Sequence, residues 1–430
     1  MTMQPKIHLA SLGCAKNLVD SETLLARLAE SGGLVGASPE EADVVIVNTC
    51  GFIGPAKLES IDVIREYGAC KEADHGKRLL VIGCLVERDR VALQVELPFV
   101  DGFFGLGEHE AIVDACGLTP VEDDGARLLL TPAHTAYLRI SEGCDNRCTY
   151  CTIPLIRGPF RSRRPDAILR EAAQLAEGGV RELNLIGQDT TAYGADLPEI
   201  YPIDRLLRNL AEIEPARWLR LLYTHPAHFT DNLISAFAEI PKLCSYVDLP
   251  LQHLDDEILT RMGRRVTQAE SLRLIEKLRS RVPGIAIRTT FILGFPGETE
   301  TQFEGLLSLI QQIRFDHLGA FAYSPETGTP AVDFPNQVPA AERTRRVGEM
   351  MRIQQEIAFE KNQERVDTQA EVLLNEPTED TDVWIGRSRI QAPDVDGVTI
   401  VLGSGLEVGR FLDVRIRGTD GYDLVAEPLD

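Results

Sequence analysis

The chain has 430 residues, which is too long for one hydrophobic core and favours about three domains. Hydrophobic residues make up 44% and charged residues 26%, as is typical of a soluble globular protein. The sequence contains no apolar run of about 18 residues and no basic-then-apolar leader, so it predicts neither a membrane-spanning helix nor a secretory signal. We therefore expect a cytoplasmic protein.

The net charge of −22 results from 66 acidic and 44 basic residues. Such a surface repels phosphate backbones, so we expect no strong nucleic-acid binding. It attracts a basic partner, although charge of this kind also serves solubility alone. The nine cysteines favour metal binding or catalysis over disulfides, because the cytoplasm keeps thiols reduced.

Residues 1–130 alternate between strand and helix patterns, which predicts an N-terminal doubly wound α/β domain. Short apolar runs of the kind found in buried parallel strands cover Lys6–Leu12, Asp43–Asn48 and Arg78–Gly83. Amphipathic helical stretches cover Ser21–Glu30 and Pro55–Tyr67.

Each of these three strands leads directly into a cysteine, namely Cys14, Cys50 and Cys84. Carboxyl ends of parallel strands form one ligand crevice, so we expect the three thiols to converge. A single cysteine at a strand end would be explained by packing. Three in succession favour a shared metal site.

Residues 131–365 contain six further strand–helix units, which predict a partial (β/α)6 barrel with its chemistry on loops at the strand carboxyl ends. The expected strands are Ala136–Ser141, Glu182–Ile186, Trp218–Tyr223, Tyr246–Leu249, Ile285–Leu293 and His317–Tyr323. The expected helices include Pro165–Glu177, Ile203–Ile213, Asp256–Met262, Gln268–Arg281 and a long closing helix over Ala340–Arg365.

The most specific motif is Cys-x3-Cys-x2-Cys, formed by Cys144, Cys148 and Cys151 directly after the first barrel strand. A structural zinc site needs a fourth ligand, and no further Cys or His lies nearby in the sequence. Three thiolates can instead hold an iron–sulfur cubane and leave one iron open. Cys70, Cys116 and Cys244 stand outside both sets, and we expect them to be buried packing residues.

Residues 366–430 are rich in short β runs separated by Gly, Pro and Asp turns, which predicts a small all-β barrel. The runs are Gln369–Leu374, Val383–Ile390, Val398–Val401, Phe411–Arg417 and Tyr422–Glu427. This segment has 14 acidic and 5 basic residues, a net charge of −9.

The Cys144/Cys148/Cys151 spacing resembles the signature of the radical S-adenosylmethionine (SAM) superfamily. The resemblance implies a 4Fe–4S cluster whose fourth iron is chelated by SAM, and reductive cleavage of SAM to a 5′-deoxyadenosyl radical. It also implies SAM contacts by Tyr150, Gln188, Arg288 and Gly294. Arg288 could equally form a structural ion pair, and the loop at Gly294 could be a simple Pro-Gly turn.

The strings LGC14AKNLVDSE, VNTC50GFI and IGC84L resemble the N-terminal domain of the radical SAM methylthiotransferase family. The resemblance covers essentially the whole chain, since the C-terminal barrel takes the place of that family's TRAM domain. It implies a second, auxiliary 4Fe–4S cluster on Cys14, Cys50 and Cys84, with its open iron facing the same substrate cavity as the first. It identifies no catalytic residue beyond the cluster ligands.

Within the family, KNLVDSE at Lys16–Glu22 and GRSRIQAPDVDG at Gly386–Gly397 resemble the RimO branch. That branch adds a methylthio group to the β-carbon of an aspartate in small-subunit ribosomal protein number twelve. The acidic barrel suits a basic protein substrate. Ala15 departs from the proline that often follows the first cysteine in this branch. The resemblance also implies a low-potential electron donor of the flavodoxin or ferredoxin type.

Two other hypotheses remain open at this point. A tRNA adenosine methylthiotransferase would share the chemistry, and its RNA binding should weaken steeply with salt. A non-enzymatic RNA-binding or scaffold protein with structural metal would take up zinc or one inert cluster and leave SAM intact.

Overall fold

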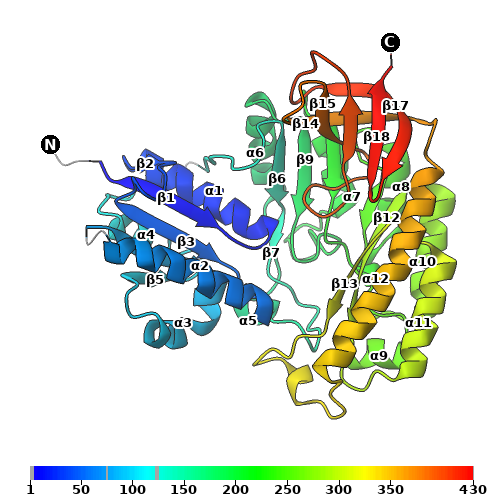
Figure 1. The fold of residues 1–430 in the computed structure, drawn as a ribbon, viewed down its shortest axis with the longest axis horizontal. Helices are drawn as coiled ribbons and strands as arrows, with labels where there is room; N and C mark the ends of the chain where they lie inside the picture. The colour runs from blue at the N-terminus through cyan, green and yellow to red at the C-terminus, as the bar shows by residue number, and fades with distance from the viewer. Residues whose placement is uncertain (1–3, 74–75, 122–124, 430) are drawn as a thin grey trace. The chain divides into compact units, whose positions relative to one another are not determined.

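The computed structural model describes residues 4–73, 76–121 and 125–429 (Figure 1). Contacts divide the chain into two compact units. The N-terminal unit comprises Met1–Leu130, Glu142–Arg161 and Ser324–Val332, and the C-terminal unit comprises Thr131–Ser141, Ser162–Tyr323 and Asp333–Asp430. The predicted three-domain division, with boundaries at 130 and 365, stays a prediction. In the described part of the chain, no helix combines the length and apolar character needed to cross a bilayer.

The N-terminal unit is built on a five-stranded parallel sheet with strand order β2-β1-β3-β4-β5. Its strands are β1 (Lys6–Ser11), β2 (Leu34–Val35), β3 (Val44–Thr49), β4 (Arg78–Gly83) and β5 (Gly102–Phe104). All residues of β3 are buried, as expected for a central strand covered on both faces.

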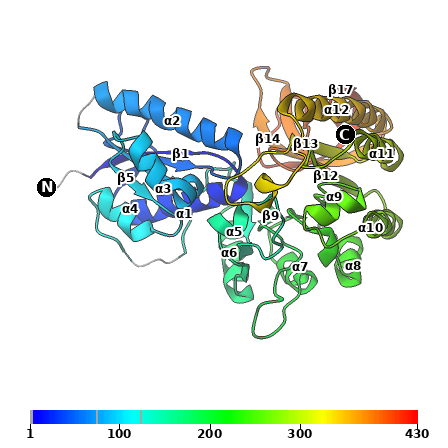
Figure 2. The ribbon, with the colours of Figure 1, turned by 90° about the horizontal axis from the view of Figure 1, so that it is seen from below.

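Four helices cover the two faces of this sheet: α1 (Ala15–Glu30), α2 (Gly54–Ala73), α3 (Cys84–Glu96) and α4 (His109–Ala115). Successive side chains of β3 point to opposite faces. Ile46 packs in a core with α1 and α4, whereas Val45 and Val47 pack in a second core with α2 and α3. Figure 2 shows α1 and α2 on opposite sides of the strands. The doubly wound α/β prediction is confirmed.

Helix α1 begins at Ala15, six residues earlier than the amphipathic pattern indicates. The extra turns contain Lys16 and Asn17, polar residues that are nevertheless buried. The reason is that Asn17 is part of a buried hydrogen-bond network at the strand ends, described below.

The larger part of the C-terminal unit contains six parallel strands in two three-stranded sheets, ordered β10-β9-β6 and β11-β12-β13. A bridge between Leu219 and Leu243 connects the two sheets. The strands are β6 (Thr135–Arg139), β9 (Glu182–Ile186), β10 (Trp218–Leu221), β11 (Tyr246–Asp248), β12 (Ala286–Leu293) and β13 (His317–Ala322). This arrangement agrees with the predicted partial barrel.

Helices alternate with these strands, and two of the helices begin with a recognisable capping sequence. They are α6 (Pro165–Glu177), α7 (Ile203–Ala211), α8 (Asp231–Glu239), α9 (Asp256–Arg261), α10 (Gln268–Arg281), α11 (Glu300–Ile313) and α12 (Ala340–Gln363). Thr267 with Glu270, and Thr299 with Gln302, form capping boxes that satisfy the first backbone N–H groups of α10 and α11. The long helix α12 packs against α11 and β13 (Figure 1).

The last five strands form a closed barrel, as predicted, with order β14-β15-β16-β18-β17. They are β14 (Gln369–Pro377), β15 (Val383–Ser388), β16 (Thr399–Leu402), β17 (Phe411–Asp420) and β18 (Asp423–Pro428). The interior contains Val372, Leu374, Val401, Val414 and Ile416. Along β17, buried Val414 and Ile416 alternate with more exposed residues, which is the period of a strand with one buried face.

A buried ion cluster joins this barrel to the six parallel strands. The carboxylate of Glu182, at the start of β9, lies between Arg387 of the small barrel and Arg220 of β10. Glu182 and Arg220 are fully buried, and Arg387 nearly so. Burial alone raises the pKa of Glu182, but the two guanidinium groups outweigh it and hold that pKa at about 2.

Further contacts come from the segment at 389–396. Asp394 accepts a hydrogen bond from the Tyr137 hydroxyl, and Asp396 accepts one from the Tyr246 hydroxyl, each at 2.7 Å. Arg389 donates to the Leu243 carbonyl at 2.8 Å. The small barrel is therefore attached to the parallel strands by several polar contacts in addition to the buried ion cluster.

We predict that Glu182→Gln destabilises the C-terminal unit by about 3–5 kcal/mol, because two buried guanidinium groups lose their carboxylate. Thermal unfolding followed by circular dichroism measures the effect. Glu427→Gln is the matched control, since the Arg417–Glu427 pair of the same barrel is about half exposed.

The same cluster predicts a pH dependence. Because the folded-state pKa of Glu182 is depressed to about 2, its contribution is complete above the unfolded value near 4.3. That contribution is lost as the pH falls from about 4.3 towards 2. The stability difference between wild type and Glu182→Gln should therefore shrink over this window, and a constant difference contradicts the prediction.

Candidate functional site

The first three candidate cysteines lie at the carboxyl edge of the N-terminal sheet. Strand order reverses between β1 and β3, which is the position where doubly wound sheets bind ligands. Cys14 is the N-cap residue of α1 after β1, Cys50 directly follows β3, and Cys84 is the first residue of α3 after β4. The structure thus places all three thiols on neighbouring loops.

Glycines allow these loops to approach one another closely. Gly13 has φ of +87°, and a Cβ there would lie 2.8 Å from Cys50 Cβ. A Cβ on Gly51 would lie 2.8 Å from the Cys84 carbonyl oxygen. Both distances are too short for a real side chain, so the loops of Cys14, Cys50 and Cys84 are in mutual contact.

Asn17 connects the ends of these strands. Its Nδ2 donates to the carbonyl oxygens of Leu12, at 3.1 Å, and Thr49, at 2.8 Å. Its Oδ1 lies 3.2 Å from Cys84 Sγ, which donates to it. Asn48 Nδ2 in turn donates to the Asn17 carbonyl at 2.9 Å. One buried amide therefore fixes the geometry of the loops that hold the cysteines.

The surroundings of this set suit an iron–sulfur cluster. Cys50 and Cys84 are buried and Cys14 is exposed. Burial raises the pKa of Cys84 to about 12, although Arg157 opposes the shift, and burial also raises the pKa of Cys50. Buried thiols of this kind become thiolates when a cation binds them, as the iron of a cluster does.

The second set lies in the segment Glu142–Arg161. Backbone hydrogen bonds shape it: Cys144 N–H donates to Gly158 O at 3.2 Å, and Cys151 N–H donates to Cys148 O at 3.1 Å. Gly143 has φ of +71°, and a Cβ there would collide with the Pro159 carbonyl oxygen. Cys144, Cys148 and Cys151 are half-buried. Three thiols on one compact loop fit a cubane with an open iron.

Both cysteine sets belong to the N-terminal unit. Thr152, the residue after Cys151, donates from Oγ1 to Phe52 O at 3.0 Å. Glu326, from the segment after β13, accepts a hydrogen bond from Gly54 N–H and pairs with Arg88 at 2.9 Å. The segments Glu142–Arg161 and Ser324–Val332 are thus held by the stretch that follows Cys50 and by helix α3, which begins at Cys84.

The four residues predicted to contact SAM occupy varied environments. Tyr150 is half-buried between Cys148 and Cys151, and Gln188 is half-buried just beyond β9. Arg288 donates to Asp248 at 3.0 Å and its Nε lies 3.5 Å from Asp396, so it already has two carboxylate partners.

The predicted contact at Gly294 also has a local explanation. Gly294 has φ of +69°, and a Cβ there would lie 2.2 Å from Cγ of Arg343. The glycine is thus needed for packing against Arg343. SAM contacts by Tyr150, Gln188, Arg288 and Gly294 stay predictions.

The remaining cysteines differ from one another. Cys116 and Cys244 are completely buried, and Cys116 belongs to the core beneath α1 and α4. Both match the expected packing role. Cys70, in contrast, is exposed on α2, so the expectation that it is buried is wrong. Its position on the outward face of that helix is the reason.

Sequence reasoning did not assemble one further cluster, made by Asp189, His225 and His228 beyond the ends of β9 and β10. Asp189 Oδ2 lies 2.8 Å from His228 Nδ1. Burial raises the pKa of Asp189, but His228 and Thr191 outweigh it and hold that pKa at about 2. Burial, aided by Arg264, lowers the pKa of His225 to about 3.

Hydrogen bonds argue against a metal at this cluster. His225 Nδ1 accepts the Ala227 N–H at 3.2 Å. Because this imidazole is neutral, the accepted bond leaves the ring proton on Nε2. Neither ring nitrogen of His225 then has a free lone pair for a metal ion. The cluster is a buried polar network at the end of the barrel where chemistry takes place in barrel enzymes.

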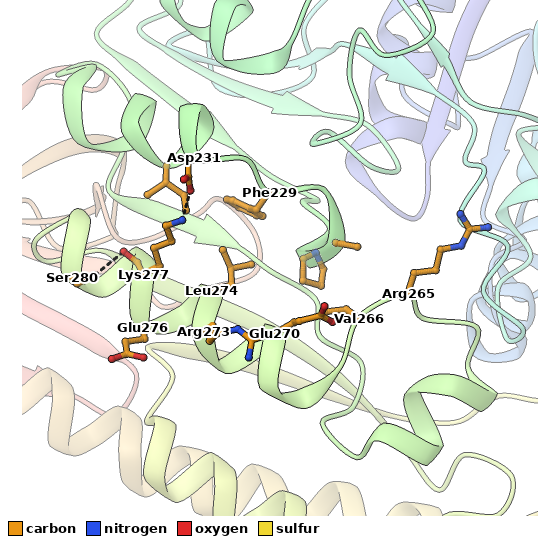
Figure 3. Close-up of a pocket in the computed structure, with 13 residues that line it drawn as sticks. Phe229, Asp231, Arg265, Val266, Glu270, Arg273, Leu274, Glu276, Lys277 and Ser280 are labelled. Carbon is orange, nitrogen blue, oxygen red and sulfur yellow. Dashed lines mark hydrogen bonds and ion pairs between the residues drawn. The ribbon is translucent and has the colours of Figure 1, made fainter.

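A cleft of about 630 Å³ lies between the segment around Phe229 and helices α8 and α10 (Figure 3). Its lining includes an ion pair between Lys277 and Asp231. Arg265, Arg273 and Glu270 add further charges of both signs. None of the candidate residues lines this cleft.

Comparisons with known proteins define the class. The Radical SAM superfamily model matches residues 138–310, the model described as Uncharacterized protein family UPF0004 matches residues 6–105, and the TRAM domain model matches residues 366–429. The chain is a radical SAM enzyme with a C-terminal TRAM domain.

The relatives define the family. A Ribosomal protein uS12 methylthiotransferase RimO from Desulforamulus reducens is 46% identical, covering 98% of this chain and 99% of the relative. The RimO of Geobacter sulfurreducens is 43% identical, covering 98% of each chain. The chain therefore belongs to the RimO family of uS12 methylthiotransferases, which confirms the family suggested by its motifs.

Among solved structures, the fold is similar to that of the radical SAM methyltransferase TsrM from Kitasatospora setae, solved with cobalamin and a [4Fe-4S] cluster. The TM-score is 0.54 at 17% identity, with 76% of this chain and 77% of that chain covered. The cobalamin-dependent radical enzyme OxsB gives a TM-score of 0.52 at 13% identity, covering 81% and 56%. These similarities concern the fold.

We predict that Gly13→Ala lowers the iron content after anaerobic reconstitution from about eight to about four per chain, because the new Cβ displaces Cys50 while the second set stays intact. Iron analysis with protein quantification measures it. Gly36→Ala is the matched control, since Gly36 has φ of +85° but a Cβ there would meet nothing within 4 Å. Equal iron loss in both variants would implicate backbone strain alone.

Proposed function

We propose that this chain adds a methylthio group to the β-carbon of an aspartate in ribosomal protein uS12. The observation that carries the proposal is the presence of two three-cysteine sets in one compact unit of a RimO-family chain. One set serves radical generation and the other serves sulfur delivery, so the reaction needs both within reach of one substrate.

The residues divide as follows in this proposal. Cys144, Cys148 and Cys151 hold the 4Fe–4S cluster that binds SAM. Cys14, Cys50 and Cys84 hold the auxiliary 4Fe–4S cluster. When bound, SAM and the two clusters supply the hydrogen-abstracting radical, the methyl group and the sulfur.

The protein's own residues orient these groups and limit access of water. Asn17 fixes the loops around the auxiliary site through its contacts with Leu12 and Thr49. The burial of Cys50 and Cys84 shields two of the three ligands. Tyr150, Gln188, Arg288 and Gly294 are the proposed SAM contacts.

The charge of the small barrel supports a basic protein substrate. Glu376, Glu379, Asp380 and Asp382 are exposed around the β14–β15 connection. Of the five arginines in residues 366–430, Arg387 is buried against Glu182 and does not offset this surface charge. An acidic surface speeds encounter with a cationic partner and repels RNA phosphates.

Two further parts of the proposal concern the cellular setting. Reductive cleavage of SAM needs an electron, and we propose a low-potential donor of the flavodoxin or ferredoxin type. Because the substrate is ribosomal and the cysteines must stay reduced to bind iron, we place the enzyme in the cytoplasm.

The direct test compares tryptic peptides of uS12 from wild-type cells, cells lacking this gene, and cells complemented with it. We expect a methylthio mass shift on one aspartate-containing peptide that disappears on deletion and returns on complementation. If uS12 is unmodified in all three strains, the proposed substrate is wrong. A methylthio group on tRNA adenosine that follows the gene would identify the tRNA reaction instead.

We also predict that substitutions in the two cysteine sets have different effects on activity in vitro. With Cys14, Cys50 and Cys84 all changed to Ala, the enzyme should still cleave SAM to 5′-deoxyadenosine but form no methylthiolated peptide. With Cys144, Cys148 and Cys151 changed to Ala, both activities should fall below detection. Chromatography measures 5′-deoxyadenosine, and mass spectrometry measures the methylthiolated peptide. Formation of the methylthiolated peptide by either variant contradicts the assignment.

A further inference from the structure

We propose that Arg157 is a positioning residue for the auxiliary site: its guanidinium binds the sulfur of Cys84 and sets the reduction potential of the cluster there. The inference rests on the proposed function in one respect, the cluster on Cys14, Cys50 and Cys84. It adds a residue from the loop of the SAM cluster to the environment of the other cluster.

Arg157 follows the short helix α5 (Ile153–Ile156), six residues after Cys151 in the sequence. Its side chain is only 3% exposed. Nη2 lies 3.3 Å from Cys84 Sγ and 2.8 Å from Asn17 Oδ1. A cation from one cysteine loop therefore directly contacts a candidate cluster ligand of the other set.

Two carboxylates keep this buried cation charged and oriented. Arg157 Nη2 pairs with Asp20 at 2.9 Å, and Nη1 pairs with Glu142 at 3.1 Å. An arginine stays protonated in proteins, so the charge at this position is permanent. Contacts on both nitrogens fix the plane of the guanidinium fork, which a lysine ammonium cannot reproduce.

The two polar partners of Cys84 Sγ differ in kind: Arg157 offers N–H groups and Asn17 offers its amide oxygen. Asn17 Nδ2 is committed to the carbonyl oxygens of Leu12 and Thr49, so the amide presents its Oδ1 to the sulfur. That oxygen accepts from a thiol and can donate nothing to a thiolate. Of these two partners, Arg157 is therefore the one that can donate to a cluster-bound sulfur.

Donors and positive charge near cluster sulfurs stabilise the reduced, more negative state and raise the reduction potential. Loss of Arg157 should lower the potential of the auxiliary cluster. A merely structural tether would leave that potential unchanged while the cluster is bound.

Arg88 provides the matched control. It is also buried, belongs to the same unit, and pairs with the carboxylate of Glu326. Its guanidinium donates to backbone carbonyls, those of Gly51 and Thr327. Arg88→Gln thus removes a comparable buried cation whose contacts are with oxygen.

The experiment uses the full chain with Cys144, Cys148 and Cys151 changed to Ala, so that the auxiliary cluster alone is observed after anaerobic reconstitution. Arg157→Gln, Arg157→Lys and Arg88→Gln are added separately. Iron content, the electron paramagnetic resonance spectrum of the reduced cluster and its midpoint potential in a redox titration are measured for each.

We expect Arg157→Gln to shift the midpoint to more negative potential and to change the resonance spectrum, Arg157→Lys to give a smaller shift, and Arg88→Gln to give little change. If Arg157→Gln alone loses the cluster, the Arg157→Lys midpoint decides: a shifted midpoint supports the proposal, and an unchanged midpoint overturns it. An unchanged midpoint and spectrum in Arg157→Gln, or equal shifts in Arg157→Gln and Arg88→Gln, overturn it. If the parent triple variant binds no cluster, the proposed function itself fails.

Discussion

Most features specific to the candidate site depend on one buried amide, that of Asn17. Three strand ends must come together if Cys14, Cys50 and Cys84 are to share a ligand, and their loops carry carbonyl groups that burial would leave without partners. Asn17 satisfies two of them, on Leu12 and Thr49, and reaches Cys84 with its oxygen. An unsatisfied buried carbonyl costs about 1–3 kcal/mol, so this single residue strongly favours the converged arrangement. The early start of α1 at Ala15 is what places Asn17 there.

The sequence predicts the strands and helices well, because each can be recognised from the local pattern of apolar and polar residues. Buried parallel strands such as β4 are continuous apolar runs, and β9 and α6 match their predicted bounds completely. The cysteines were found because three strands lead into them. The burial of Asn17 could not be predicted in the same way, because its residue type favours the surface and one of its partners, Thr49, lies 32 residues away in the sequence.

The same limit applies to contacts between distant segments. Nothing local to Glu326 shows that it will bind Gly54 and Arg88, or that the segment Ser324–Val332 will join the N-terminal unit. Arg157 likewise stands six residues beyond the cysteine motif with no local sign of its partners. For Arg288, the sequence also allows a structural ion pair as the alternative to a SAM contact. Its contacts with Asp248 and Asp396 agree with that alternative. A sequence motif can identify candidate residues, but their partners depend on packing between segments that are distant in the sequence.

The two cysteine sets also differ in a way that suits different tasks. Cys144, Cys148 and Cys151 all lie half-buried on a loop shaped by backbone hydrogen bonds. Cys50 and Cys84 are buried, Cys84 in contact with the polar side chains of Asn17 and Arg157, while Cys14 is exposed. A low dielectric strengthens the interaction of the guanidinium with sulfur, and the exposed thiol leaves one side accessible. In the proposed function the auxiliary site gains from both properties, protection of two cluster ligands and access at the third.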